Sequence, residues 1–176
     1  HDDIFAPTYI SECLNAHKNN PECISVFTNF NVLDLKSNRI TEKQSPSSRS
    51  SNFVFSRTMI SLLDMHPNMI YGLHKTKILR KIKIETFDWF DIFIIIQLSY
   101  FGKIIVIPKY LYDVGTDGPR KPYSLTGKYV SFKIFRNNMI KFTKNKFPFR
   151  HRIPLLLFTL YVSIKGEKSI NNRIDN

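Results

Sequence analysis

The segment from Trp89 to Phe101, WFDIFIIIQLSYF, constrains the fold more than any other part of the chain. Apolar residues fall on nearly every face of a helix drawn through it, so such a helix must be covered on most of its sides. The segment is too short to cross a bilayer, because a spanning helix needs about 20 residues. Gly102 follows it and is a typical C-terminal cap. The segment therefore predicts a helix buried at the centre of a packed domain.

Around this helix, segments with helical and strand patterns alternate through the first 118 residues. Apolar residues at helical spacing predict helices, whereas runs of β-branched and aromatic residues predict strands. We expect helices at 7–17, 53–65 and 78–82, a strand at 23–35, a short strand and turn at 69–76, and a strand at 103–108 ended by Pro108. The polar, serine-rich stretch 41–52 predicts a surface loop, and 113–122 predicts a turn-rich linker. This alternation indicates an α/β fold.

The positive charge of the chain is concentrated in its last third. The 176 residues contain 26 Lys and Arg against 14 Asp and Glu, which gives a formal net charge of +12. Residues 1–118 hold 13 of the cations and 12 of the carboxylates, so +11 of this charge belongs to residues 119–176. We therefore expect an α/β domain over 1–118 and a basic, aromatic, mainly helical tail over 119–176.

The tail contains a run of 12 apolar-leaning residues, IPLLLFTLYVSI, which is also too short to span a bilayer. Two interpretations remain open. The helix lies in a membrane interface with its cations on an anionic lipid surface, or it packs on the α/β domain and leaves a basic face in water. Charge alone also permits nucleic acid as a partner, but no recognition motif in the sequence supports it.

Two acidic groups are candidates for a site. Asp2 and Asp3 are adjacent and precede a predicted helix. Mg²⁺ is typically held by one or two carboxylates plus substrate phosphates, although such a pair also suits the dipole of a helix N-terminus. Asp88 and Asp91 are three residues apart and share a helix face. Asp88 also suits an N-cap, whereas Asp91 lies among apolar residues, which raise a carboxyl pKa toward that of a general base.

A second candidate region is the short segment MIYGLHKT. Gly72 marks a position where backbone or a ligand comes close. His74 is a candidate contact to phosphate or acceptor, although a packed or solvent-facing histidine fits the same pattern. The sequence contains no Walker A motif, no GxGxxG and no nucleophile elbow.

Taken in order, four segments resemble the second half of a family 2 glycosyltransferase, a member of the GT-A group that uses nucleotide-sugar donors. HDDIFAPTYI resembles the DxD region, and ISVFTNFNVLDLKSNRI resembles the strand and turn that follow it. MIYGLHKTKIL resembles a segment near the acceptor side. FDWFDIFIIIQLSYFGKIIVIPKYLY resembles the region of the catalytic base, its helix and the next strand. The resemblance extends over residues 1–112.

The resemblance implies roles for the two acidic groups. Asp2 and Asp3 match the cluster that binds Mg²⁺ or Mn²⁺ on the donor diphosphate. Asp88 matches the base that deprotonates the acceptor hydroxyl. The family more often has Glu where this chain has Phe87, and this departure leaves Asp91 as the second candidate for the base.

The same resemblance implies that Gly72, His74, Lys75 and Trp89 contact the substrates. The expected fold is a partial, Rossmann-like GT-A domain that lacks its N-terminal nucleotide-binding half. The expected activity is sugar transfer with inversion to a glycan or lipid-linked acceptor, in cell-envelope or exopolysaccharide synthesis. The QxxRW motif of processive synthases is not visible, which favours transfer of one or a few sugars.

The resemblance places such an enzyme in the cytoplasm, either free or peripheral on the inner face of the membrane. The alternative function is a non-catalytic basic module that binds an anionic membrane surface or nucleic acid, in which the aspartates cap helices.

Overall fold

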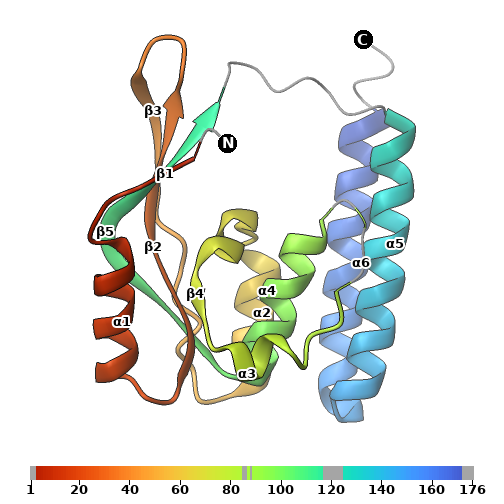
Figure 1. Ribbon diagram of the computed structural model, residues 1–176. Helices are drawn as coiled ribbons and strands as arrows, with labels where there is room; N and C mark the ends of the chain where they lie inside the picture. Colours follow the sequence, from red (N-terminus) through yellow and green to blue (C-terminus); the bar gives the residue numbers. More distant parts are fainter. Residues whose placement is uncertain (1–2, 85–86, 88, 117–124, 172–176) are drawn as a thin grey trace.

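The computed structural model describes residues 3–84, 87, 89–116 and 125–171, with the side chains of these residues except 125–132 and 165–171. Figure 1 shows a β-sheet beside a group of helices, with a long helical hairpin at the far side. The described helices are α1 (Tyr9–Asn19), α2 (Val54–Leu63), the 3-10 helix η1 (Pro67–Tyr71), α3 (Thr76–Leu79), α4 (Phe90–Phe101), α5 (Leu125–Lys146) and α6 (Phe149–Asn171). The strands are β1 (Ile4–Phe5), β2 (Cys23–Asp34), β3 (Arg39–Gln44), β4 (Leu73–His74) and β5 (Lys103–Thr116). The fold is therefore mixed α/β, as the sequence predicts.

The sheet has five strands in the order β1-β5-β2-β3, with β4 also beside β2. The two long strands, β2 and β5, run parallel, whereas β1, β3 and β4 pair antiparallel with their neighbours. Most residues of β2 are buried, as expected for a central strand covered on both faces. Because β2 and β5 are parallel, their carboxyl ends lie at the same end of the sheet, the upper end in Figure 1.

Strand β5 continues past Pro108, so the prediction that this proline ends the strand is wrong. The pairing with β2 shifts by two residues between Ile107 and Tyr110, which leaves Pro108 in an irregularity of the ladder. A bulge accommodates a residue that has no N–H to donate. The strand therefore extends to Thr116 and includes the first residues of the expected linker 113–122.

The expected surface loop over 41–52 is also wrong in part. Residues 41–44 belong to β3, which pairs with the second half of β2. Farther along, Arg49 forms an isolated antiparallel bridge with Ile104 of β5, and its side chain is fully buried. The serine-rich stretch does lie at the surface, as the sequence predicts, and within 41–52 only Pro46 and Arg49 are buried.

Helix α4 is buried at the centre of the domain, as its sequence predicts. One side of α4 contributes Ile94, Ile95 and Leu98 to a first core shared with α1, β2, β5 and η1. The other side contributes Ile92, Phe93 and Ile96 to a second core, which also contains residues of α2, α5 and α6. Each fully buried aliphatic or aromatic side chain stabilises the fold by about 1.5–3 kcal/mol. Helix α4 therefore joins the two cores.

Gly102 caps the carboxyl end of α4, as the sequence predicts, and its backbone N–H donates to the carbonyl oxygen of Leu98. Its φ of −179° is extended. A Cβ atom at this position would lie 2.5 Å from a methyl carbon of Ile24. The glycine is therefore needed because the turn from α4 into β5 passes directly over the side chain of Ile24.

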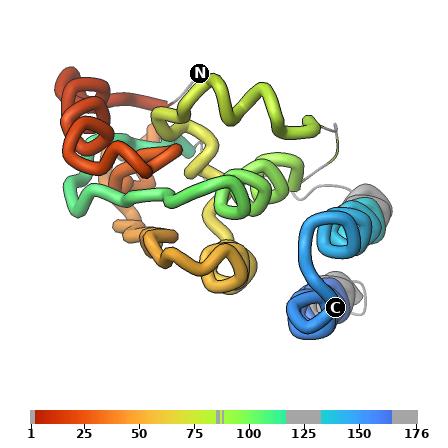
Figure 2. Tube along the Cα trace, turned by 90° about the horizontal axis from the view of Figure 1, so that it is seen from below, coloured from red at the N-terminus to blue at the C-terminus, as the bar shows by residue number. Residues whose placement is uncertain are grey.

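The tail forms a hairpin of two long helices, α5 and α6, in agreement with the prediction that it is mainly helical. Phe135, Met139 and Phe142 of α5 are buried against α4 in the second core. Helix α6 contacts α5 and α2, and Figure 2 shows the hairpin at one corner of the molecule. Among the described residues, no helix is both long enough and apolar enough to cross a membrane.

Candidate functional site

Asp3 is held in place by two hydrogen bonds from the carboxyl-terminal half of β5. The hydroxyl of Tyr112 donates to Asp3 Oδ2 at 2.9 Å, and the backbone N–H of Gly115 donates to Oδ1 at 3.3 Å. The two residues that follow, Ile4 and Phe5, pair with β5 as strand β1. Asp3 is thus fixed near the carboxyl ends of β5 and its parallel neighbour β2. Its predicted partner, Asp2, lies outside the described residues.

Tyr112 reaches Asp3 from a cluster of aromatic rings. Its ring stacks on Phe5 with centroids 4.7 Å apart, and the ring of Tyr71 lies 5.6 Å away. Burial, and then the neighbouring carboxylate, raise the pKa of the Tyr112 hydroxyl far above its usual value. The hydroxyl therefore stays protonated and donates its hydrogen to Asp3 at any physiological pH.

A polar pair lies at the neighbouring register position of the same strands. Asn31 of β2 donates from Nδ2 to Oδ1 of Asp113 at 2.7 Å, and Asp113 is also the register partner of Ile4. Asn31 is buried, and its Oδ1 has no hydrogen-bond partner among the described residues. Buried acceptors in proteins are almost always satisfied. This amide oxygen is therefore open to a donor from outside the described residues.

The amino-terminal end of α4 carries the second acidic group. Trp89 precedes the helix with a φ of 82°, a left-handed backbone that a non-glycine residue adopts only under constraint. The half-buried carboxylate of Asp91 accepts the backbone N–H of Ile92 at 2.7 Å. Burial raises the pKa of Asp91, although this hydrogen bond partly offsets the effect. Asp88 lies outside the described residues.

In Figure 1 the start of α4 is directed toward the end of the sheet where Asp3 is held, but it lies well below the upper end of β5. Helix α4 leads through Gly102 directly into β5 and packs back against it. Figure 1 shows that the amino-terminal end of α4 is directed upward, as the carboxyl end of β5 is. Ligands of open α/β sheets bind beyond the carboxyl ends of the parallel strands. Asp3 is therefore at the end of the sheet where such a ligand would lie, and the start of α4 is directed toward that end.

The segment Gly72–Lys75 lies elsewhere, on the amino-terminal half of β2, where β4 pairs with Ser25 and Val26. A Cβ atom on Gly72 would lie 2.7 Å from the carbonyl oxygen of Val26. Close approach of backbone therefore explains this glycine, and no ligand is required to explain it.

His74 and Lys75 make contacts within the protein. His74 Nδ1 lies 2.8 Å from Ser25 Oγ, and its Nε2 lies 2.8 Å from the carbonyl oxygen of Ile70. Burial lowers the pKa of His74, so the ring is neutral at pH 7, with Nε2 donating and Nδ1 accepting. The ammonium of Lys75 donates to the carbonyl oxygen of Pro21.

The predicted substrate contact Trp89 faces the second core. Its ring lies 6.2 Å from that of Phe135 on α5, and it packs against the buried residues of that core. The strained backbone at Trp89 therefore accompanies the docking of α5 beside the start of α4.

The donor atoms at Asp3 fit a divalent cation held in part by a ligand. Each carboxylate oxygen accepts one described hydrogen bond and keeps a further lone pair. Among the described residues, no three His, Cys, Asp or Glu side chains converge on one point. This is compatible with Mg²⁺ or Mn²⁺, because Mg²⁺ is commonly bound through one or two carboxylates, substrate phosphates and water.

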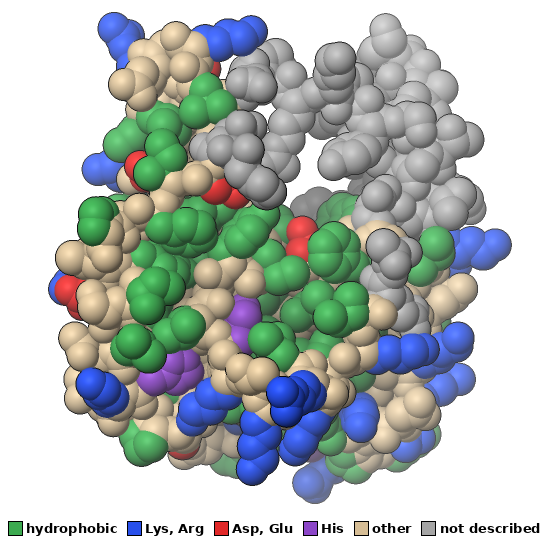
Figure 3. All heavy atoms as spheres, in the orientation of Figure 1, with side chains coloured by type: hydrophobic (Ala, Val, Ile, Leu, Met, Phe, Trp, Pro, Cys, Tyr) green, Lys and Arg blue, Asp and Glu red, His purple; other side chains and the backbone are tan. Residues whose placement is uncertain are grey.

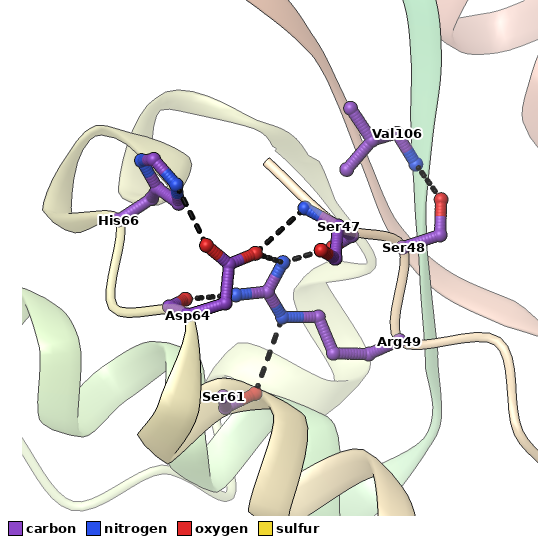
Figure 4. Close-up of polar contacts among 7 residues, drawn as sticks. All are labelled: Ser47, Ser48, Arg49, Ser61, Asp64, His66 and Val106. Atoms are coloured by element: carbon purple, nitrogen blue, oxygen red, sulfur yellow. Dashed lines mark hydrogen bonds and ion pairs between the residues drawn. The ribbon is translucent and has the colours of Figure 1, made fainter. Parts of the chain in front are cut away.

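A buried polar cluster surrounds Arg49, as Figure 4 shows, and it was not predicted from the sequence. The guanidinium donates to the carbonyl oxygens of Ser47 and Asp64 and, at 3.4 Å, to Ser61 Oγ. Its Nη1 also lies 3.5 Å from the Asp64 carboxylate. Arginine is mostly exposed in proteins, so nothing in a serine-rich stretch signals that this side chain is internal.

Asp64 connects the cluster to a histidine. One carboxylate oxygen lies 2.8 Å from His66 Nε2, and the other accepts the backbone N–H of Ser47 at 2.7 Å. Burial alone would raise the pKa of Asp64, but the N–H of Ser47 and the nearby basic groups outweigh it and lower the pKa. The cluster fastens the serine-rich stretch to α2, and its hydrogen bonds within the protein indicate a structural role.

A second buried arginine, Arg57 of α2, acts in the same way. Its Nε donates to the carbonyl oxygen of Ser99 in α4 at 2.8 Å, and its Nη1 donates to that of Ser51 at the same distance. The two arginines together hold residues 45–52 against α2, α4 and β5.

A scan against models of protein families finds no match for the chain, and a search of curated proteins finds none either.

Proposed function

We propose that this chain forms part of an inverting, metal-dependent glycosyltransferase. It would transfer a sugar from a nucleotide-sugar donor to a hydroxyl of a glycan or lipid-linked acceptor, in the synthesis of an envelope or extracellular polysaccharide. The fold would then be part of a GT-A domain. The proposal rests on the four ordered segments that resemble family 2 glycosyltransferases and on one structural observation.

That observation is the fixed carboxylate of Asp3 near the carboxyl ends of β2 and β5, with the acidic start of α4 directed to the same end of the domain. A transfer of this kind needs two carboxyl functions with different environments. One must remain ionised beside a diphosphate, and the other must accept a proton. The hydrogen bonds from Tyr112 and Gly115 orient the carboxylate of Asp3, whereas burial raises the pKa of Asp91 and so favours its protonated form.

The chemical step is a single displacement at the anomeric carbon of the donor sugar. The acceptor oxygen forms a bond to that carbon, the bond to the diphosphate oxygen breaks, and the nucleoside diphosphate leaves with the electron pair. The acceptor proton passes to the base, Asp88 or Asp91. Attack from the face opposite the leaving group inverts the configuration. A rigid helix start suits the base, because in-line attack requires accurate positioning.

Asp3, with Asp2, would hold the divalent cation. When bound, the cation would neutralise the charge that develops on the leaving diphosphate. The chain's own contribution there is the orientation of Asp3 by Tyr112 and Gly115, since groups that orient a metal ligand commonly change metal affinity 10- to 100-fold.

The proposal is tested on the full-length protein, with Mn²⁺ and a panel of UDP- and GDP-sugars. We expect metal-dependent release of the nucleoside diphosphate. Asn in place of the base should lower turnover by about 10²–10⁴-fold, the usual contribution of general base catalysis. Asp88→Asn and Asp91→Asn are compared because only one of them is expected to show the full loss.

Glu22→Gln is the matched control. Glu22 is exposed and lies just before β2, at the opposite end of the sheet from Asp3. Its loss should leave turnover unchanged. The mechanism is wrong if Asp88→Asn and Asp91→Asn both retain full turnover, and the metal assignment is wrong if Asp3→Asn leaves the Mn²⁺ dependence unaltered.

A further inference from the structure

Helix α6 carries apolar side chains on its inward and on its outward side. On the inward side Leu155 is fully buried in the second core and Phe158 packs against that core. The side chains of Thr159 and Ser163 are fully buried, and each hydroxyl donates to the carbonyl oxygen four residues earlier in the helix. The face toward α5 and α2 is therefore built partly from small hydroxyl side chains. A helix that packs on a domain in water normally directs its apolar stripe inward.

The outward face of α6 is apolar along its described length. Exposed large apolar side chains recur at spacings of three and four residues, so they form one stripe: Phe149, Ile153, Leu157, Leu160, Tyr161 and Ile164. Leu157 is 62% exposed and Phe149 is 72% exposed. From Phe149 to Ile164 the stripe extends about 22 Å at 1.5 Å per residue. A continuous exposed stripe of this kind marks a contact with another apolar phase or surface.

The charge of the helical hairpin is almost entirely positive. The hairpin, residues 125–171, contains ten Lys and Arg and one acidic residue, Glu167, which lies beyond the stripe. Among the described cations, Lys141, Lys144 and Lys146 are exposed on α5, and Arg150 lies at the start of α6. Figure 3 shows Lys and Arg side chains along the side of the molecule where α5 lies.

We propose that α6 lies flat in the interface of an anionic lipid bilayer, with the apolar stripe Phe149–Ile164 among the acyl chains and the cations of the hairpin on the headgroups. An interfacial helix combines an apolar face with a basic one, and each surface cation adds attraction to anionic lipid. A second copy of the chain would oppose the same positive charges, which disfavours self-association through this face. The proposal is independent of the glycosyltransferase assignment.

The test is flotation of the 176-residue chain with two kinds of vesicle, phosphatidylcholine alone and phosphatidylcholine with about one-third phosphatidylglycerol. We expect binding to the anionic vesicles that weakens as salt rises. The double variant Ile153→Asn, Leu157→Asn should bind at least about tenfold more weakly, because it removes apolar area from the stripe. Lys141→Gln with Lys144→Gln should weaken binding by about fivefold or more for each cation lost.

Leu63→Asn is the matched control for the stripe. Leu63 on α2 is 64% exposed, nearly the same as Leu157, but lies outside the stripe. Its substitution should leave vesicle binding unchanged. Circular dichroism melting is recorded for every variant, and Tyr161→Ser replaces the double variant if that one does not fold.

Three results would overturn the proposal. The first is no flotation with the anionic vesicles. The second is an equal loss of binding in Leu63→Asn. The third is a lipid-free dimer, detected by sedimentation velocity, that Leu157→Asn dissociates, since the stripe would then be covered by a second copy.

Discussion

The hydroxyl of Tyr112 lies 2.9 Å from a carboxylate oxygen of Asp3, although the two residues are 109 positions apart in the chain. The tyrosine ring is almost fully buried among aromatic neighbours, so its hydroxyl has little freedom to move. The orientation of Asp3 therefore depends on the packing of the sheet. Within the proposed function, this contact links the interior of the domain to the metal ligand.

The first prediction concerns this contact. Tyr112→Phe removes the hydroxyl and keeps the ring, so the free energy of unfolding should fall by only about 1 kcal/mol. Within the proposed function, the affinity of the full-length protein for Mn²⁺ with UDP should fall about 10- to 100-fold, because Asp3 loses its orienting donor. Isothermal titration calorimetry measures the affinity. Tyr110→Phe is the control, since Tyr110 Oη pairs with Ser45 at an exposed position, and an equal loss there would refute the role of Tyr112.

The second prediction concerns the stability cost of Asp91. Burial raises its pKa in the folded protein, so the folded state holds this proton more tightly than the unfolded state does. The ionised carboxylate therefore destabilises the fold at pH values above the folded pKa, and this penalty vanishes below the unfolded pKa. The free energy of unfolding of Asp91→Asn, measured relative to that of the wild type, should therefore increase as the pH rises from 4 to 8. Urea denaturation at several pH values measures the difference, and a difference independent of pH would contradict the assignment.

The third prediction concerns the buried Arg49. Arg49→Met removes the guanidinium, so the backbone carbonyl oxygens of Ser47 and Asp64 lose this donor and the Asp64 carboxylate loses one of its partners. Breaking a buried ionic cluster on one side costs about 3–5 kcal/mol. Arg80→Met, on an exposed residue after α3, should change stability by no more than about 0.5 kcal/mol. Chemical denaturation compares the two, and equal effects would show that the Arg49 cluster contributes little.

The fourth prediction concerns His74, whose pKa burial lowers below its usual value. The unfolded chain therefore binds the proton at a higher pH than the folded protein does. The neutral His74 ring makes its full contribution to the free energy of unfolding above the pKa of the unfolded chain, near 6.5. This contribution declines as the pH falls through that value toward the pKa of the folded protein. His74→Gln should be less stable at pH 7.5 and should show a smaller decline between pH 7.5 and 5.5. Thermal melting across this range tests it, and an unchanged slope would count against a buried neutral His74.

The parts of the fold that the sequence predicts are those set by local pattern. The segment around Ile92–Leu98 is apolar on every side, and only a central helix can bury it. The run from Cys23 to Asp34 is similarly limited to an interior strand. In these segments, burial of apolar surface dominates and favours the same structure as local propensity.

The parts that the sequence does not predict depend on partners far away in the chain. Pro108 ends a strand by local rules, but the long parallel pairing with β2 continues around it as a bulge. Arg49 is buried because Ser47, Ser61 and Asp64 surround it, and no local pattern specifies that arrangement. In the candidate site, the contact between Tyr112 and Asp3 could not be predicted from the sequence for the same reason. Asp2 and Asp88 lie outside the described residues, so their roles stay predictions.

The position of α4 between the two cores has a consequence for how the protein denatures. Neither core can lose its packing without exposing one side of the same apolar helix. The sheet and the helical hairpin should therefore melt together in one all-or-none transition. The sole tryptophan, Trp89, reports the hairpin side by fluorescence, and its unfolding curve should superimpose on that of the whole chain by circular dichroism.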